Sequence, residues 1–103
     1  MIARVWRGTT LAADGDAYAA YLEETGMKKA RALPGACGTL VLRRERDGYA
    51  EFETILLFDS LADVKAFAGA ELDAAVFFPE DDRYLAEREL DVRHFEADVN
   101  IVA

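Results

Sequence analysis

The stretch from residue 36 to residue 58 constrains the fold of this chain more than any other part of the sequence. It contains Asp47-Gly48, the strongest short-range signal for a two-residue type I′ turn, in which both central residues take a positive φ. Such a turn fixes every cross-strand pair of a long β-hairpin. In that register Cys37 is expected opposite Phe58, as an unreactive buried thiol.

Both faces of this expected hairpin become apolar away from the turn. Its second strand ends in the unbroken run Ile55-Leu56-Leu57-Phe58, whereas a sheet with one wet face alternates apolar and polar residues. Each face therefore needs a cover, and a chain of 103 residues has helices for only one of them. The second cover is most simply another copy of the same protein, so we expect a homodimer.

Length and composition indicate one globular domain over residues 1–103 and exclude several classes of partner. Hydrophobic residues make up 52% of the chain, which is too many for a disordered protein. The net charge of -8 repels phosphate backbones, so no nucleic-acid partner is expected. No apolar run reaches the length of a membrane span and the first residues lack a signal-peptide pattern. We therefore expect no membrane partner and a cytoplasmic location.

The sequence offers little that could hold a metal ion or a cofactor. One Cys and one His cannot supply the side chains of a transition-metal site. No Gly-rich strand-to-helix turn is present for the phosphates of a dinucleotide or a flavin. We therefore expect neither a metal site nor a cofactor.

The segments around the hairpin predict two helical regions and two further strands. In chain order we expect a strand at 2–9, a helix from Asp14 or Asp16 to about residue 32, the hairpin, a helix capped by Ser60 and ended by Gly69, a helical piece at 71–78, a short turn or helix after Pro79, and a strand at 90–102. This βαββαβ order predicts an α+β, ferredoxin-like fold, with helices on one face of a four-stranded antiparallel sheet.

Short motifs occur along nearly the whole chain. They are Ile2-Ala3-Arg4-Val5-Trp6-Arg7-Gly8, Pro34-Gly35, Phe58-Asp59-Ser60 with Phe67, Phe77-Phe78-Pro79-Glu80-Asp81, and Val92-Arg93-His94-Phe95-Glu96. With these motifs the chain resembles the antibiotic-biosynthesis-monooxygenase family of the dimeric α+β barrel superfamily. The resemblance implies that two sheets meet face to face in a homodimer, and that each subunit has a pocket between its helices and its sheet.

The resemblance also implies a kind of chemistry. Cofactor-free members of that family oxidise aromatic or polyphenolic small molecules, whose anions react directly with O₂. A haem-degrading branch uses an Asn, a Trp and a haem-ligating His at positions that we align with Trp6, Phe67 and Phe77. All three residues differ here, so the resemblance argues against haem chemistry in this chain.

Two residues are candidates for catalysis. His94 is the only side chain that titrates near neutral pH without help, which suits a general base. The alternative is a strand histidine that bonds a neighbour or faces solvent. Arg4 could stabilise a substrate anion, or it could form a buried ion pair with one of the acids at 80–82.

Candidate ligand-binding residues are mostly aromatic. Trp6, Phe67, Phe77 and Phe78 would form a wall for a flat ligand, and Tyr84 would offer a hydroxyl group. The alternative for the four apolar rings is an ordinary hydrophobic core. Other tyrosines, at positions 18 and 21, are expected to pack the first helix with their hydroxyl groups in water.

The sequence thus leaves two functions open. One is a cofactor-independent monooxygenase of an aromatic small molecule, with His94 as the base and Arg4 as the anion stabiliser. The other is a non-catalytic homodimer of the same fold that binds a small molecule or has a structural role. The two differ in whether Arg4, Trp6 and His94 converge on an open cavity or are packed against Phe77 and Phe78.

Overall fold

A computed structural model describes residues 1–102 and has an α+β fold compatible with the ferredoxin-like type. Its antiparallel sheet has five strands in the order β2-β3-β1-β4, and β5 also pairs with β1. The strands are β1 (Ile2–Leu11), β2 (Ala36–Arg46), β3 (Tyr49–Phe58), β4 (Leu85–Arg88) and β5 (Arg93–Glu96), and the helices are α1 (Gly15–Leu22), α2 (Lys28–Arg31), α3 (Leu61–Ala68) and α4 (Asp81–Tyr84).

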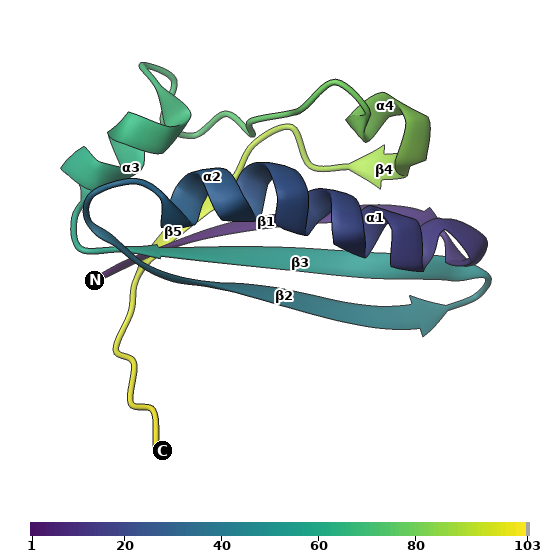
Figure 1. Ribbon diagram of the computed structural model, residues 1–103, viewed down its shortest axis with the longest axis horizontal. Helices are drawn as coiled ribbons and strands as arrows, with labels where there is room; N and C mark the ends of the chain where they lie inside the picture. Colours follow the sequence, from purple (N-terminus) through teal and green to yellow (C-terminus); the bar gives the residue numbers. More distant parts are fainter. Residues whose placement is uncertain (103) are drawn as a thin grey trace.

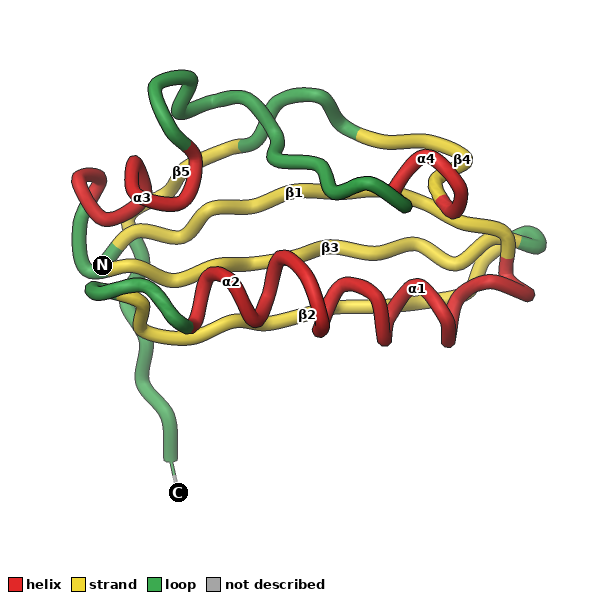
Figure 2. Tube along the Cα trace, turned by 45° about the horizontal axis from the view of Figure 1, so that its top comes forward, coloured by secondary structure: helices red, strands yellow, loops and turns green. Residues whose placement is uncertain are grey.

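The helices all lie on one side of the sheet (Figure 1). The loop between α3 and α4 lies on this same side (Figure 2). Beyond β5 the chain leaves the sheet on the opposite side, where no helix covers the strands (Figure 1). The single helical layer that the sequence predicts is therefore confirmed.

The hairpin has the register that the turn predicts. Asp47 and Gly48 both have a positive φ, 54° and 83°, and the pairs run from Arg46 with Tyr49 to Gly38 with Leu57. The expected pair of Cys37 with Phe58 is wrong, because the strand bulges between Ala36 and Gly38. As a result Cys37 is exposed and not buried.

The strand pairing divides the apolar residues between the two faces of the sheet. On the helix side, the large buried side chains of the core include Tyr18, Phe52, Phe58 and Val64. On the other side a separate, smaller cluster contains Ala3, Val5 and Leu57, with Ile55 and Ala97 packed beside it. The side chains of β1 alternate between the two faces, since Trp6 belongs to the first cluster and its neighbour Val5 to the second.

The first helical region ends near residue 32, as expected, but it is not a uniform α-helix. Between α1 and α2 the chain forms a π-helical turn, η2 (Glu23–Met27), which contains Gly26. A side chain at that glycine would touch the Phe78 ring, with a Cβ only 3.4 Å from Cε2. Glycine here thus permits a close approach between the helix and the loop that follows α3.

The second helical region is shorter than expected. The Ser60 cap is confirmed, because its Oγ accepts the Asp63 backbone N–H at 3.3 Å. The predicted helix at 71–78 is wrong, and this segment is an extended loop. Its backbone bonds go to distant groups instead, since Ala75 donates to the Leu90 carbonyl and the Asp73 carbonyl accepts from Val92.

The last part of the chain also departs from the prediction. One strand was expected at 90–102, but two short strands share the edge of β1, with β4 beside residues 8–10 and β5 beside residues 2–5. The sheet therefore has five strands in place of four. Beyond β5 the backbone N–H of Ala97 donates to the Met1 carbonyl at 2.9 Å.

The contact between Gly35 and α3 gives a test of this fold. Gly35 and Gly69 have nearly the same φ, 81° and 79°, but only a Cβ at Gly35 would overlap the Asp63 carboxylate. We expect Gly69→Ala to cost about 1 kcal/mol through backbone strain. We expect Gly35→Ala to cost about 1–3 kcal/mol more, since Asp63 must move away from Ser60. Urea unfolding of both variants measures this, and equal losses would contradict the contact.

Candidate functional site

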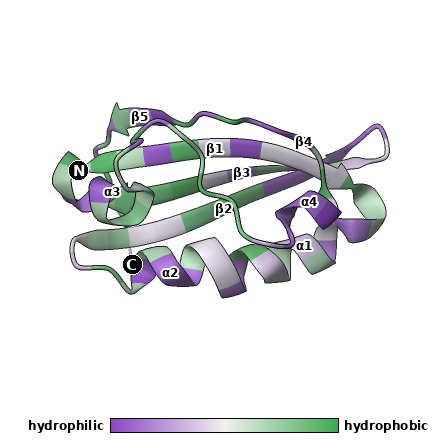
Figure 3. Cartoon of the chain, turned by 90° about the horizontal axis from the view of Figure 1, so that it is seen from above, coloured by the Kyte–Doolittle hydropathy of each residue, from purple (hydrophilic) through white to green (hydrophobic). Residues whose placement is uncertain are grey.

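A cavity lies between the helices and the sheet of this subunit. Its free volume is about 50 Å³, and it is lined from β1, α1, η2, β3, α3 and the loop that precedes α4. Seen from the helix side, that loop runs over the strands beside α1 and α2 (Figure 3). Residues 75–78 of this loop, which the sequence predicted to be helical, close this side of the cavity.

The predicted aromatic residues meet at this cavity. Trp6, Phe67, Phe77 and Phe78 all line it, although they come from three separate elements of the fold. The Trp6 and Phe77 rings are edge to face, with centroids 6.2 Å apart, and the Trp6 indole N–H donates to the Glu89 carbonyl at 2.8 Å. This wall is apolar, since its one polar ring atom already has a partner.

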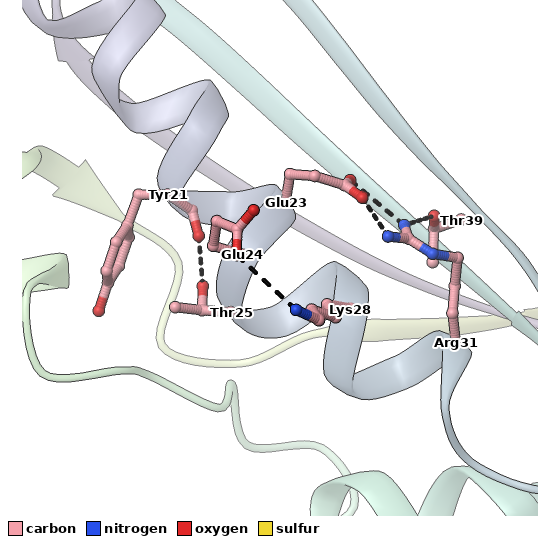
Figure 4. Close-up of polar contacts among 7 residues, drawn as sticks. All are labelled: Tyr21, Glu23, Glu24, Thr25, Lys28, Arg31 and Thr39. Atoms are coloured by element: carbon pink, nitrogen blue, oxygen red, sulfur yellow. Dashed lines mark hydrogen bonds and ion pairs between the residues drawn. The ribbon is translucent and has the colours of Figure 1, made fainter.

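The η2 turn supplies one polar group to the lining and is fastened on its outer side. Thr25 lines the cavity, and its hydroxyl group donates to the Tyr21 carbonyl at 2.7 Å (Figure 4). On the outer side Glu23 pairs with Arg31, and that guanidinium also donates to the Thr39 hydroxyl at 3.0 Å (Figure 4). The turn is therefore linked both to α2 and to β2.

Arg4 lines the cavity but is engaged elsewhere. It is only 3% exposed, and its guanidinium donates to the Leu72 and Ala74 carbonyls, both at 2.6 Å. The expected ion pair with an acid at 80–82 is therefore not present in the described residues 1–102. Burial lowers the pKa of Arg4, and the charge of Asp73 opposes that shift. Its main role here is to hold the loop that covers the cavity.

His94 is next to Arg4 and does not line the cavity. Arg4 Nη1 lies 3.1 Å from His94 Nε2, and since a guanidinium can only donate, Nε2 is the acceptor. The proton of the neutral ring is then on Nδ1, which lies 3.4 Å from an Asp73 carboxylate oxygen. Burial and then the Arg4 charge lower the pKa of His94, and Asp73 opposes this. The nitrogen that would act as a base is thus occupied by Arg4.

Tyr84, the remaining predicted residue, also lies outside the cavity lining. Its ring packs against Tyr18 and Tyr21, with centroids 5.6 and 5.8 Å away. The structure therefore brings Arg4 and the four apolar aromatic residues to one cavity. His94 and Tyr84 are not part of the cavity lining.

Two ionisable residues that line the cavity, Tyr18 and Asp81, have other roles than the sequence suggested. Tyr18 was expected to have a wet hydroxyl group, but it is 1% exposed and donates to Asp81 Oδ1 at 2.9 Å. The other oxygen of Asp81, Oδ2, accepts the Phe78 backbone N–H at 2.7 Å. Burial and the neighbouring carboxylate raise the pKa of Tyr18, so it remains a protonated phenol. The sequence pointed to Asp81 only as a possible partner of Arg4 and as part of the Phe77-Phe78-Pro79-Glu80-Asp81 motif.

The single thiol of the described residues is engaged by a carboxylate. The Cys37 thiol lies 3.2 Å from an Asp59 carboxylate oxygen, and this hydrogen bond raises the pKa of the thiol. Within residues 1–102, no three His, Cys, Asp or Glu side chains gather to hold a metal ion. The helices of this same part of the chain are too short and polar to cross a membrane.

The comparisons with known proteins add no assignment. No protein-family model matches the chain, and no curated protein matches it either. The function must therefore be inferred from the cavity and from the uncovered face of the sheet.

The contact between His94 and Arg4 predicts how stability depends on pH. The pKa of His94 is lowered in the folded protein, so the unfolded chain, with a pKa near 6.5, binds the proton more readily. The stabilising effect of neutral His94 is present above that pH and is lost as the pH falls through the folded-state pKa. Between about pH 7 and about pH 5, the melting temperature of wild type should fall more steeply than that of His94→Gln. Parallel curves would contradict this role.

Proposed function

We propose that this protein is a homodimer in which each subunit binds a small aromatic molecule in the cavity between helices and sheet. The observation that carries the proposal is the cavity lining, where Trp6, Phe67, Phe77 and Phe78 surround a few polar groups. Ligand sites in proteins have this character, with an apolar wall and a small number of placed polar atoms. A cytoplasmic location belongs to the proposal, since the exposed Cys37 thiol would stay reduced there.

The geometry favours binding over the chemistry expected of His94 and Arg4. His94 Nε2 accepts from Arg4, and Arg4 donates to two backbone carbonyls of the covering loop. Neither group can serve a ligand unless these bonds break and leave a buried cation without acceptors, which is costly. We therefore regard the contact between Arg4 and His94 as structural, because it stabilises the loop that covers the cavity.

Cofactor-free oxygenation of an aromatic molecule is a second candidate, and the Asp81 carboxylate favours it. Asp81 lines the cavity and could accept the proton in place of His94 from a polyphenol that is more acidic than Tyr18. The resulting electron-rich anion is the species that reacts with O₂ in the family that this chain resembles. The free volume of about 50 Å³ is smaller than the roughly 150 Å³ that admits a benzene ring elsewhere, so any such ligand must displace part of the wall.

The homodimer is supported by the side of the sheet that carries no helix. Leu40, Leu42 and Phe95 lie on that side and are 47%, 45% and 51% exposed, next to the buried cluster of Ala3 and Val5. Exposed apolar groups gathered on one face of a sheet favour an interface. We propose that two such faces pack together, as the resemblance implies, and bury at least about 2,000 Å² in total.

Binding and oxygenation are separated by one set of measurements. We expect single-ring phenols to raise the melting temperature of the protein by binding its folded state, and to quench Trp6, the only tryptophan. If the protein is also an oxygenase, reduced polyphenols should cause oxygen uptake that survives a chelator. Asp81→Asn should then slow it about 10²-fold or more, as for a lost general base. Absence of binding for every phenol tested would contradict the proposed function.

The dimer is tested with a matched pair of leucine variants. Leu40 lies on the uncovered face and Leu61 on α3, and the two are similarly exposed, at 47% and 50%. In light scattering at micromolar concentration, wild type should have twice the 11.4 kDa mass of the chain. Leu40→Glu should dissociate to monomers, because it buries a charge in the interface, while Leu61→Glu should remain dimeric. A monomeric wild-type protein would contradict the dimer.

A further inference from the structure

The strongest polar feature of the cavity is the pair formed by Tyr18 and Asp81. Both side chains line the cavity, and they are 1% and 5% exposed. They come from α1 and α4, which are far apart in the sequence, and are joined by the bond from the Tyr18 hydroxyl to Asp81 Oδ1. The rest of the lining is largely apolar, from side chains such as Trp6, Leu56 and Phe77, and its other polar side chains are those of Arg4, Thr25 and Thr54.

The pair has hydrogen-bond acceptors to spare and no donor to spare. The only hydroxyl proton of Tyr18 is used on Asp81, while the lone pairs of its oxygen remain. The Asp81 carboxylate offers about four acceptor positions and accepts one bond on each oxygen, from Tyr18 and from the Phe78 backbone. Among residues 1–102, no Lys, Arg or His lies within ion-pair distance of Asp81. The pair can therefore receive a proton donor, and it would repel an acceptor.

We propose that Tyr18 and Asp81 select the ligand of this cavity by accepting a hydrogen bond from one hydroxyl or amino group on a small apolar body. This inference rests on the proposed function, since it names the group through which the bound molecule is recognised. The apolar part of the ligand then lies against Trp6 and Phe77. Asp81 also orders the loop through the Phe78 N–H, so recognition and closure of the cavity share one side chain.

The cavity limits the rest of the ligand. With about 50 Å³ of free volume, it accommodates a body no larger than one ring, and only with a small movement of its wall. The chemical class that fits is therefore a single-ring phenol or aniline, or an aliphatic alcohol of similar size.

The inference is tested with two ligands of the same shape, para-fluorophenol and para-fluorotoluene, whose binding is followed by fluorine NMR. A hydrogen bond to a charged acceptor should make the phenol bind about 10- to 100-fold more tightly to wild type. Asp81→Asn, which removes the charged acceptor, should bring the two affinities to within about threefold of each other, mainly by weakening phenol binding. Tyr18→Phe should lower the preference only in part, because the Asp81 carboxylate still accepts. Tyr21→Phe is the matched control, because it removes a neighbouring hydroxyl that does not line the cavity and should keep the preference.

The results separate the role of Tyr18 and Asp81 from ligand binding itself. Equal affinities for the two ligands in wild type, or a preference that survives both variants, would overturn the role of the pair while leaving ligand binding intact. Binding of neither ligand would overturn the proposed function itself. If the variants fail to fold, nuclear Overhauser contacts between the Tyr18 ring and bound para-fluorophenol in wild type decide the question, since their absence would place the phenol elsewhere.

Discussion

The covering of the cavity depends on the hydrogen bonds that the buried Arg4 guanidinium donates. Arg4 stands on the helix side of β1 and donates to two backbone carbonyls of the loop between α3 and α4. Without those acceptors the charge could not remain buried, and without Arg4 the carbonyls of Leu72 and Ala74 would lack partners. The loop in turn brings Phe77 and Phe78 to the cavity and Asp81 to Tyr18. One strand residue thus organises a loop that is remote from it in sequence.

The parts of the fold that could be predicted are those specified by short-range rules. The Asp47-Gly48 turn determines the register of the hairpin, and the alternation in β1 determines which side chains face the helices. The segment at 71–78 could not be predicted in this way. Its apolar residues have a spacing that suits a helix, but its backbone groups bond to Arg4 and to residues 90–92, which only the folded chain brings near.

The same distinction applies to the candidate site. Trp6 and Phe67 could be predicted to share an interior, because each lies on the buried side of a regular element. The pair of Tyr18 and Asp81 could not, since it depends on the path of an irregular loop. His94 was expected at a pocket because its residue type suits a base, yet its cross-strand partner in β1 is Arg4, and that neighbour occupies its nitrogen. Residue type alone therefore indicated the wrong base.

The π-helical turn has a consequence for how the first helix tolerates changes in its length. Tyr18 and Met27 are about two and a half α-helical turns apart, so a regular α-helix would point them to opposite sides, yet both line the cavity. The wider turn at 23–27 adjusts the angular phase between the two halves of the helix. The deletion of one residue within it would restore an ordinary helical bond pattern and leave α1 and α2 close to their present phase, because the wide turn accommodates one extra residue. This helix thus tolerates the loss of one residue at 23–27 better than the loss of one within α1 or α2, where no wide turn absorbs the change.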